Sequence, residues 1–80
     1  MIKTVNESLA EMIEVFKTDV QEFLRARRLI ALLHLHFPGS RANFDLHDCD
    51  KILRVEGENL KTEEVIRIMK ESGAACNLLE

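Results

Sequence analysis

The chain has 80 residues, of which 46% are hydrophobic and 31% are charged, and its formal net charge at pH 7 is −3. A chain of this length has room for one small domain with a single core, and its hydrophobic content is too high for a disordered protein. The negative net charge argues against a nucleic-acid partner, because surfaces that bind nucleic acid carry an excess of Lys and Arg.

The first residues, MIKTVNESLA, lack the apolar run of a signal peptide, and the longest apolar stretch, LIALLHLHF, is too short to cross a bilayer. We therefore expect a cytoplasmic protein with no membrane partner. The two cysteines lie 27 positions apart and are expected to be reduced thiols rather than a disulfide.

Residues 1–11 are interpreted as an N-terminal arm, and residues 12–80 as the folded domain. Apolar residues recur at helical spacing through the arm, which suggests a short amphipathic helix. These are Ile2, Val5, Leu9 and Met12. The stretch MIEVFKTDV that follows is rich in β-branched and aromatic residues and predicts the first strand.

A long helix is predicted from about Val20 to Phe37, with Asp19 as its N-cap and Glu22 at capping-box spacing. One apolar stripe of this helix is expected to meet the sheet: Phe23, Ala26, Ile30, Leu33 and Phe37. Further apolar residues point elsewhere: Leu24, Ala31, Leu32 and Leu35. Either the arm or another copy of the chain covers this second side, or some leucines are simply exposed, since leucine is a good helix former.

Pro38-Gly39 ends the helix, and the alternating stretches RANFDL and KILRVEG on either side of the polar HDCD predict a β-hairpin. Thr62 is predicted to cap a second helix, with an apolar side of Val65, Ile66 and Met69 and with Gly73 as its C′ residue. The closing stretch AACNLLE predicts a last strand.

The element order is therefore β-α-β-β-α-β. Two split β-α-β units of this kind predict the α+β ferredoxin-like sandwich, a four-stranded antiparallel sheet with both helices on one face. Strand alternation is expected to place Phe16, Ile52 and Leu79 on the open face of the sheet. Together with Leu24, Leu32 and Leu35, these residues form the predicted interface for a second copy or a protein partner.

From about Glu11 to Glu80 the chain resembles the heavy-metal-associated domain, the fold of copper chaperones and of the soluble modules of metal-pumping ATPases. The residues that carry the resemblance are FPGS, NFDL, ILRVEG and KTEEVIRIMKESG in that order. The chain is also similar to small bacterial proteins of the same outline. The resemblance implies the ferredoxin-like fold and a metal-binding loop after the first strand.

The family binds copper through Cys-x-x-Cys at the end of the first strand, but the sequence there reads KTDVQEFL. Asp19 and Glu22 stand at about the positions of the two thiolates. Because soft Cu(I) requires sulfur ligands, the metal residues of the family do not carry over. These two acids are better explained by the predicted helix cap.

A displaced site at the HDCD turn is the alternative. The topology brings this turn to the same edge of the sheet as Thr18, Asp19 and Gly73, and His47 and Cys49, with Asp48 or Asp50, could supply three ligands for zinc. Acids in a tight turn also hydrogen-bond their own backbone, so the same residues fit a plain turn. A catalytic Cys49 is disfavoured because the two flanking acids favour the thiol form.

Cys76 is predicted to point inward as a small buried hydrophobic residue. With no phosphate-binding loop and little concave volume expected, the sequence favours a non-enzymatic binding or assembly module that needs no cofactor. Binding of a metal or small ligand at the turn, with weakly held zinc as the cofactor, is the alternative.

Overall fold

The computed structural model describes residues 11–79. It contains four strands and two helices in the order β1 (Glu11–Thr18), α2 (Phe23–His36), β2 (Arg41–Asp45), β3 (Ile52–Glu58), α3 (Thr62–Glu71) and β4 (Cys76–Leu78). The helix predicted for the N-terminal arm lies outside this range over residues 1–10. Glu11 and Met12, which the prediction counted with the arm and its helical pattern, belong to β1 instead.

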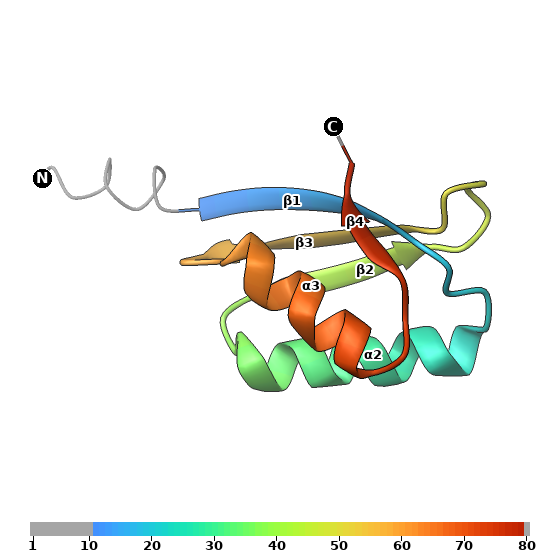
Figure 1. Cartoon of the computed structure of the whole chain (residues 1–80). Helices are drawn as coiled ribbons and strands as arrows, with labels where there is room; N and C mark the ends of the chain where they lie inside the picture. The colour runs from blue at the N-terminus through green and yellow to red at the C-terminus, as the bar shows by residue number, and fades with distance from the viewer. Residues whose placement is uncertain (1–10, 80) are drawn as a thin grey trace, which may run out of the picture.

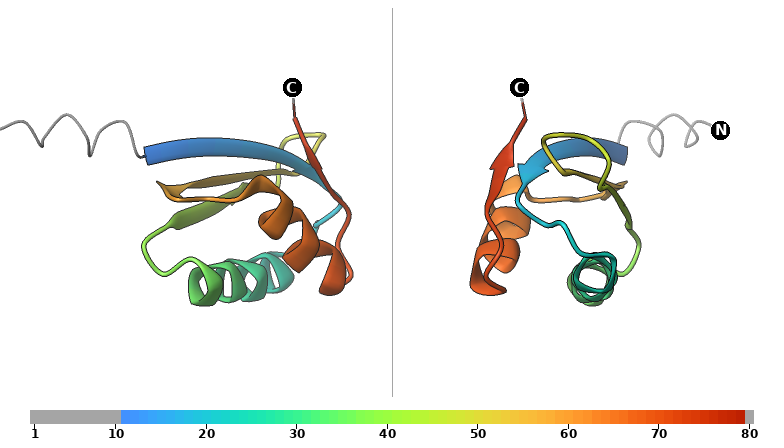
Figure 2. Two further views of the ribbon diagram at one scale, coloured as in Figure 1. Left: turned by 60° about the vertical axis from the view of Figure 1, so that its left-hand side comes forward. Right: turned by 90° about the vertical axis from the view of Figure 1, so that its right-hand side faces the viewer.

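The strands form one antiparallel sheet in the order β2-β3-β1-β4, and both helices lie on the same side of it (Figure 1). Seen end-on, sheet and helices are two separate layers, with α2 beneath β2 and α3 beneath β4 (Figure 2). The predicted α+β ferredoxin-like sandwich is confirmed. It leaves the second face of the sheet without a covering layer among residues 11–79.

The core lies between the two layers and draws on both helices, on three of the strands and on the segments that follow β1, β3 and α3. Its buried hydrophobic residues are Phe16, Val20, Ala26, Leu29, Leu33, Leu53, Val55, Leu60, Val65, Ile68, Met69, Ala74 and Cys76. Burial of this apolar surface is the main force that holds the helices against the sheet.

Helix α2 begins three residues later than the sequence predicts, and the residue before it is Glu22, whose side chain makes no capping hydrogen bond. The predicted Asp19 cap is therefore wrong. The helix ends as predicted before Pro38, with the Phe37 N–H donating to the Leu33 carbonyl at 2.8 Å.

The buried side of α2 also differs from the predicted stripe. Phe23 is 66% exposed, whereas Leu29 is buried. The predicted stripe assumed that the helix contacts only the sheet. In the structure the helix packs against both β2 and α3, so its buried side is rotated toward α3. Leu32 belongs to this side as well, because it is partly buried against the core.

Helix α3 and the segment after it follow the sequence closely. Val65, Ile68 and Met69 are buried, and Gly73 has φ +87°, the left-handed backbone expected of a C′ glycine. Thr62 is the first helical residue rather than the cap, and the preceding Lys61 makes no side-chain capping bond.

Candidate functional site

The β2–β3 turn, residues 46–51, holds the cluster of acids, histidine and cysteine that the sequence singles out. Asp45 Oδ1 accepts the His47 N–H at 3.2 Å, and Asp48 Oδ1 accepts the Asp50 N–H at 2.8 Å. Lys51 has φ +46° and its ammonium donates to the Leu46 carbonyl at 2.9 Å. Asp45 and Asp48 therefore act as turn-forming residues, each bonding the backbone two positions on.

The turn is attached to the end of β1. The Thr18 N–H donates to the Asp50 carbonyl at 3.0 Å, and the Thr18 hydroxyl donates to the Lys51 carbonyl at 2.6 Å. The same hydroxyl accepts the Val20 N–H at 3.2 Å. These bonds confirm that the turn and the end of β1 lie at one edge of the sheet.

Three potential metal ligands meet in this turn. One ligand atom from each of Asp48, Cys49 and Asp50 lies within 4.8 Å of the others. His47 is exposed and does not belong to this group, so the predicted set is brought together only in part. Cys49 is exposed, and Asp48 already accepts the backbone bond that shapes the turn.

The loop between β1 and α2, where the resemblance places a thiolate pair, has a structural role. Asp19 Oδ1 accepts the Ala75 N–H at 3.0 Å and so joins this loop to the segment before β4. The guanidinium of Arg25, in the first turn of α2, donates to the Gly73 carbonyl at 2.8 Å and makes a second link to the segment before β4. Sequence reasoning missed both links, because neither partner is near in the chain.

The outer side of α2 exposes large apolar side chains. Leu24 is 67% exposed and Leu35 is 77% exposed, so both side chains point away from the core. A shallow hollow of about 490 Å³ lies beside Leu24 and reaches Ser72 at the end of α3. Its lining residues are Glu22, Leu24, Arg25, Arg28, Leu29, Leu32 and Ser72.

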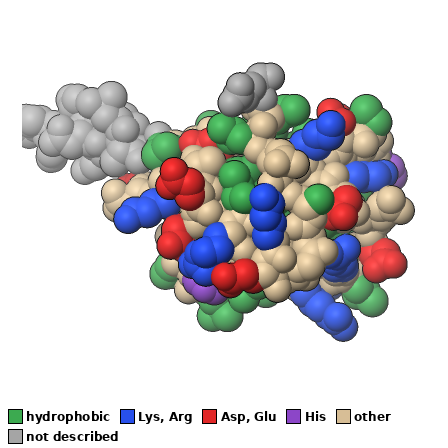
Figure 3. All heavy atoms as spheres, viewed as in Figure 1, with side chains coloured by type: hydrophobic (Ala, Val, Ile, Leu, Met, Phe, Trp, Pro, Cys, Tyr) green, Lys and Arg blue, Asp and Glu red, His purple; other side chains and the backbone are tan. Residues whose placement is uncertain are grey.

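The same helix is positively charged, although the chain as a whole is negative. Residues 23–36 include three arginines and no acidic residue. Arg27 lies over the Phe23 ring, 5.8 Å from its centroid, in a cation–π contact at the helix surface. Hydrophobic and basic side chains both appear along the lower edge of the space-filling view, where α2 lies (Figure 3).

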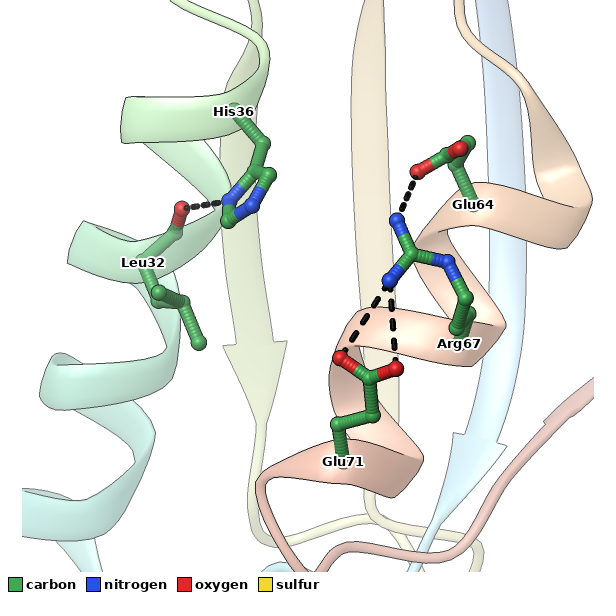
Figure 4. A network of polar contacts seen from close by, with 5 residues as sticks. All are labelled: Leu32, His36, Glu64, Arg67 and Glu71. Atoms are coloured by element: carbon green, nitrogen blue, oxygen red, sulfur yellow. Dashed lines mark hydrogen bonds and ion pairs between the residues drawn. The ribbon is translucent and has the colours of Figure 1, made fainter.

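Helix α3 differs in charge from α2. Arg67 bonds Glu64 one turn before it and Glu71 one turn after it (Figure 4). The hydrogen bonds that Arg67 donates to the carboxylates of Glu64 and Glu71 raise its pKa, so it stays charged. Residues 62–71 contain three acidic and two basic side chains, so α3 does not share the excess of positive charge that α2 carries.

On the open face of the sheet, one of the three predicted residues is placed wrongly. Phe16 pairs with Leu53 of β3, and opposite residues in an antiparallel pair point to the same side, so Phe16 belongs to the core and is fully buried. Ile13 and Val15 of β1 take the open face instead. The other two predicted residues, Ile52 and Leu79, do lie on the open face. Ile52 is half-buried there, and Leu79 is 41% exposed.

Cys76 is fully buried on β4, as predicted. Burial raises the pKa of its thiol to about 11, so this cysteine is protonated and unreactive at neutral pH.

Neither helix between residues 11 and 79 is long and apolar enough to cross a membrane. Comparison of the chain with protein-family models, with curated proteins and with solved structures gave no match.

Proposed function

We propose that this chain is a non-enzymatic protein-binding module that contacts its partner through the outer side of α2. The exposure of Leu24 and Leu35 on one helix carries the proposal. Large exposed apolar side chains on one side of a helix are typical of surfaces that another protein covers.

The charge of α2 indicates what kind of partner surface fits. Arg27 and Arg28 are exposed beside the leucines, and no acid between residues 23 and 36 balances them. A partner surface with an apolar centre and acidic residues around it would bury the leucines and pair the arginines.

The double variant Leu24→Gln/Leu35→Gln tests this role. Both side chains are exposed, so the variant is expected to fold normally and to lose partners that wild type retains on co-purification from its native cell. Ile13→Gln is the matched control, because Ile13 is 62% exposed on the open sheet face and lies outside the proposed surface. The same set of partners with both variants would contradict the proposal.

Ligand binding at the β2–β3 turn is the second candidate, and the meeting of Asp48, Cys49 and Asp50 favours it. In a zinc titration followed by calorimetry, wild type would then bind more tightly than Cys49→Ser/His47→Ala. Equal affinity of the two proteins would exclude this candidate.

A further inference from the structure

We infer that two copies of this chain pair antiparallel through their β2 strands, with the two-fold axis at Asn43, and so join their sheets into one. This surface lies at the edge of the sheet and is separate from the outer side of α2. The inference therefore stands whether or not α2 binds a partner.

The first observation is that β2 is an edge strand. In the order β2-β3-β1-β4, its one neighbour among the described strands is β3. Every second backbone N–H and C=O of such a strand points away from the sheet, which makes the edge a template for another strand. Residues 41–45 contain no proline that would block this pairing.

The second observation is that the strand is complementary to itself. In RANFD, antiparallel pairing about Asn43 sets Arg41 of each copy directly opposite Asp45 of the other. Both side chains are exposed on the open face of the sheet, where the two charge pairs would form. Charged edge residues usually prevent pairing, but opposite charges at equal distances from the axis favour it.

The third observation concerns the helix-facing side of the same strand. The pairing sets Phe44 of one copy opposite Ala42 of the other. Beside Ala42 there is a hollow of about 360 Å³, lined by Ile30, His34, Ser40, Arg41, Ala42 and Asn43. Phe44 is only half-buried in the single chain, and the hollow beside the small Ala42 offers space for the aromatic ring of the second copy.

Arg41 already donates to Glu56 of its own chain at 2.9 Å, from the neighbouring strand β3. A guanidinium has five N–H donors, so the bond to Glu56 does not prevent a further bond to Asp45 of the second copy. The bond to Glu56 holds the Arg41 side chain on the open face, where Asp45 of the second copy would lie opposite it.

Charge exchange tests the register. In Asp45→Arg the two strands would meet arginine to arginine, and in Arg41→Asp aspartate to aspartate. By sedimentation velocity at micromolar to millimolar concentration, wild type is expected to approach twice the monomer mass. Each variant is expected to raise the dissociation constant about tenfold or more. An equimolar mixture of the two variants should dimerise again, because one strand is then wholly basic and the other wholly acidic.

Glu63→Arg and Lys61→Asp are the controls, since they make the same changes in net charge on exposed residues outside the edge. They should dimerise as wild type does. A wild-type chain that stays monomeric throughout, or variants whose mixture does not recover the dimer, would overturn the inference. Dimerisation lost in Leu24→Gln/Leu35→Gln but kept in both charge variants would overturn it too, and would assign self-association to α2.

A cross-link gives a second measurement that does not depend on charge. In a Cys49→Ser background, Asn43→Cys places two thiols across the axis and is expected to form an intermolecular disulfide on mild oxidation. Glu63→Cys in the same background should not. Equal cross-linking of the two would contradict the register.

Discussion

At the scale of a single residue, Gly57 of β3 shows how closely this strand packs against Ser40, the residue before β2. A Cβ added to Gly57 would lie 2.9 Å from the Cβ of Ser40 and 3.0 Å from its Cα. Ser40 cannot easily yield, because its hydroxyl donates to the Phe37 carbonyl at 2.7 Å in the segment that links α2 to β2. The residue needed at this position is set by the neighbouring backbone.

We therefore predict that Gly57→Ala lowers the free energy of unfolding by about 1–3 kcal/mol, because Ser40 and its backbone must shift. Urea denaturation measures the loss. The matched control is Gly39→Ala, where an added Cβ meets no atom within 4 Å, and which should change stability by less than about 0.5 kcal/mol. Equal losses in the two variants would contradict this account.

At the scale of an element, α2 carries apolar residues on two sides that have different roles. Leu33 is fully buried between the layers, and Leu35, two positions on, is 77% exposed. The same residue type in the same helix is thus part of the core at one position and part of the proposed binding surface at the other.

Leu33→Ala is expected to lower the free energy of unfolding by about 2–5 kcal/mol, through lost burial and the cavity that remains. Leu35→Ala should cost less than about 0.5 kcal/mol, because alanine is an excellent helix former and little buried area is lost. Thermal or urea unfolding compares the two. If Leu35→Ala proved as damaging as Leu33→Ala, the outer side of α2 would be buried in the protein as purified.

At the scale of the whole molecule, the buried thiol of Cys76 links stability to pH. Folding raises its pKa from an ordinary value near 9 to about 11. Above pH 9 the unfolded chain loses this proton while the folded chain keeps it. The stabilisation is therefore complete below about pH 9 and is lost as the pH rises toward 11.

We predict that wild type and Cys49→Ser lose stability more steeply between pH 9 and 11 than Cys76→Ala does. Each protein is compared with its own value at pH 8, so that the cost of the smaller side chain in Cys76→Ala cancels. Lysine side chains also titrate in this range, but they are common to all three proteins. Equal slopes from chemical denaturation across the series would rule out Cys76 as the source.

The site was harder to predict than the fold, for reasons visible at single residues. The acids of the β2–β3 turn could be assigned to a turn, because Asp45 and Asp48 bond backbone groups two positions away. Asp19 could not be assigned, because its partner is the N–H of Ala75, 56 positions along the chain. Local sequence suggested a helix cap there, and the tertiary contact replaced it.

The sequence by itself determined the order of the elements, the hairpin and the left-handed glycine after α3, because each depends on interactions within a few residues. Only the tertiary structure decided which side of β1 is buried. The segment MIEVF has apolar residues in both alternation phases, so periodicity defines two faces without choosing between them. Pairing of Phe16 with Leu53 makes that choice, because opposite residues in an antiparallel sheet share a face.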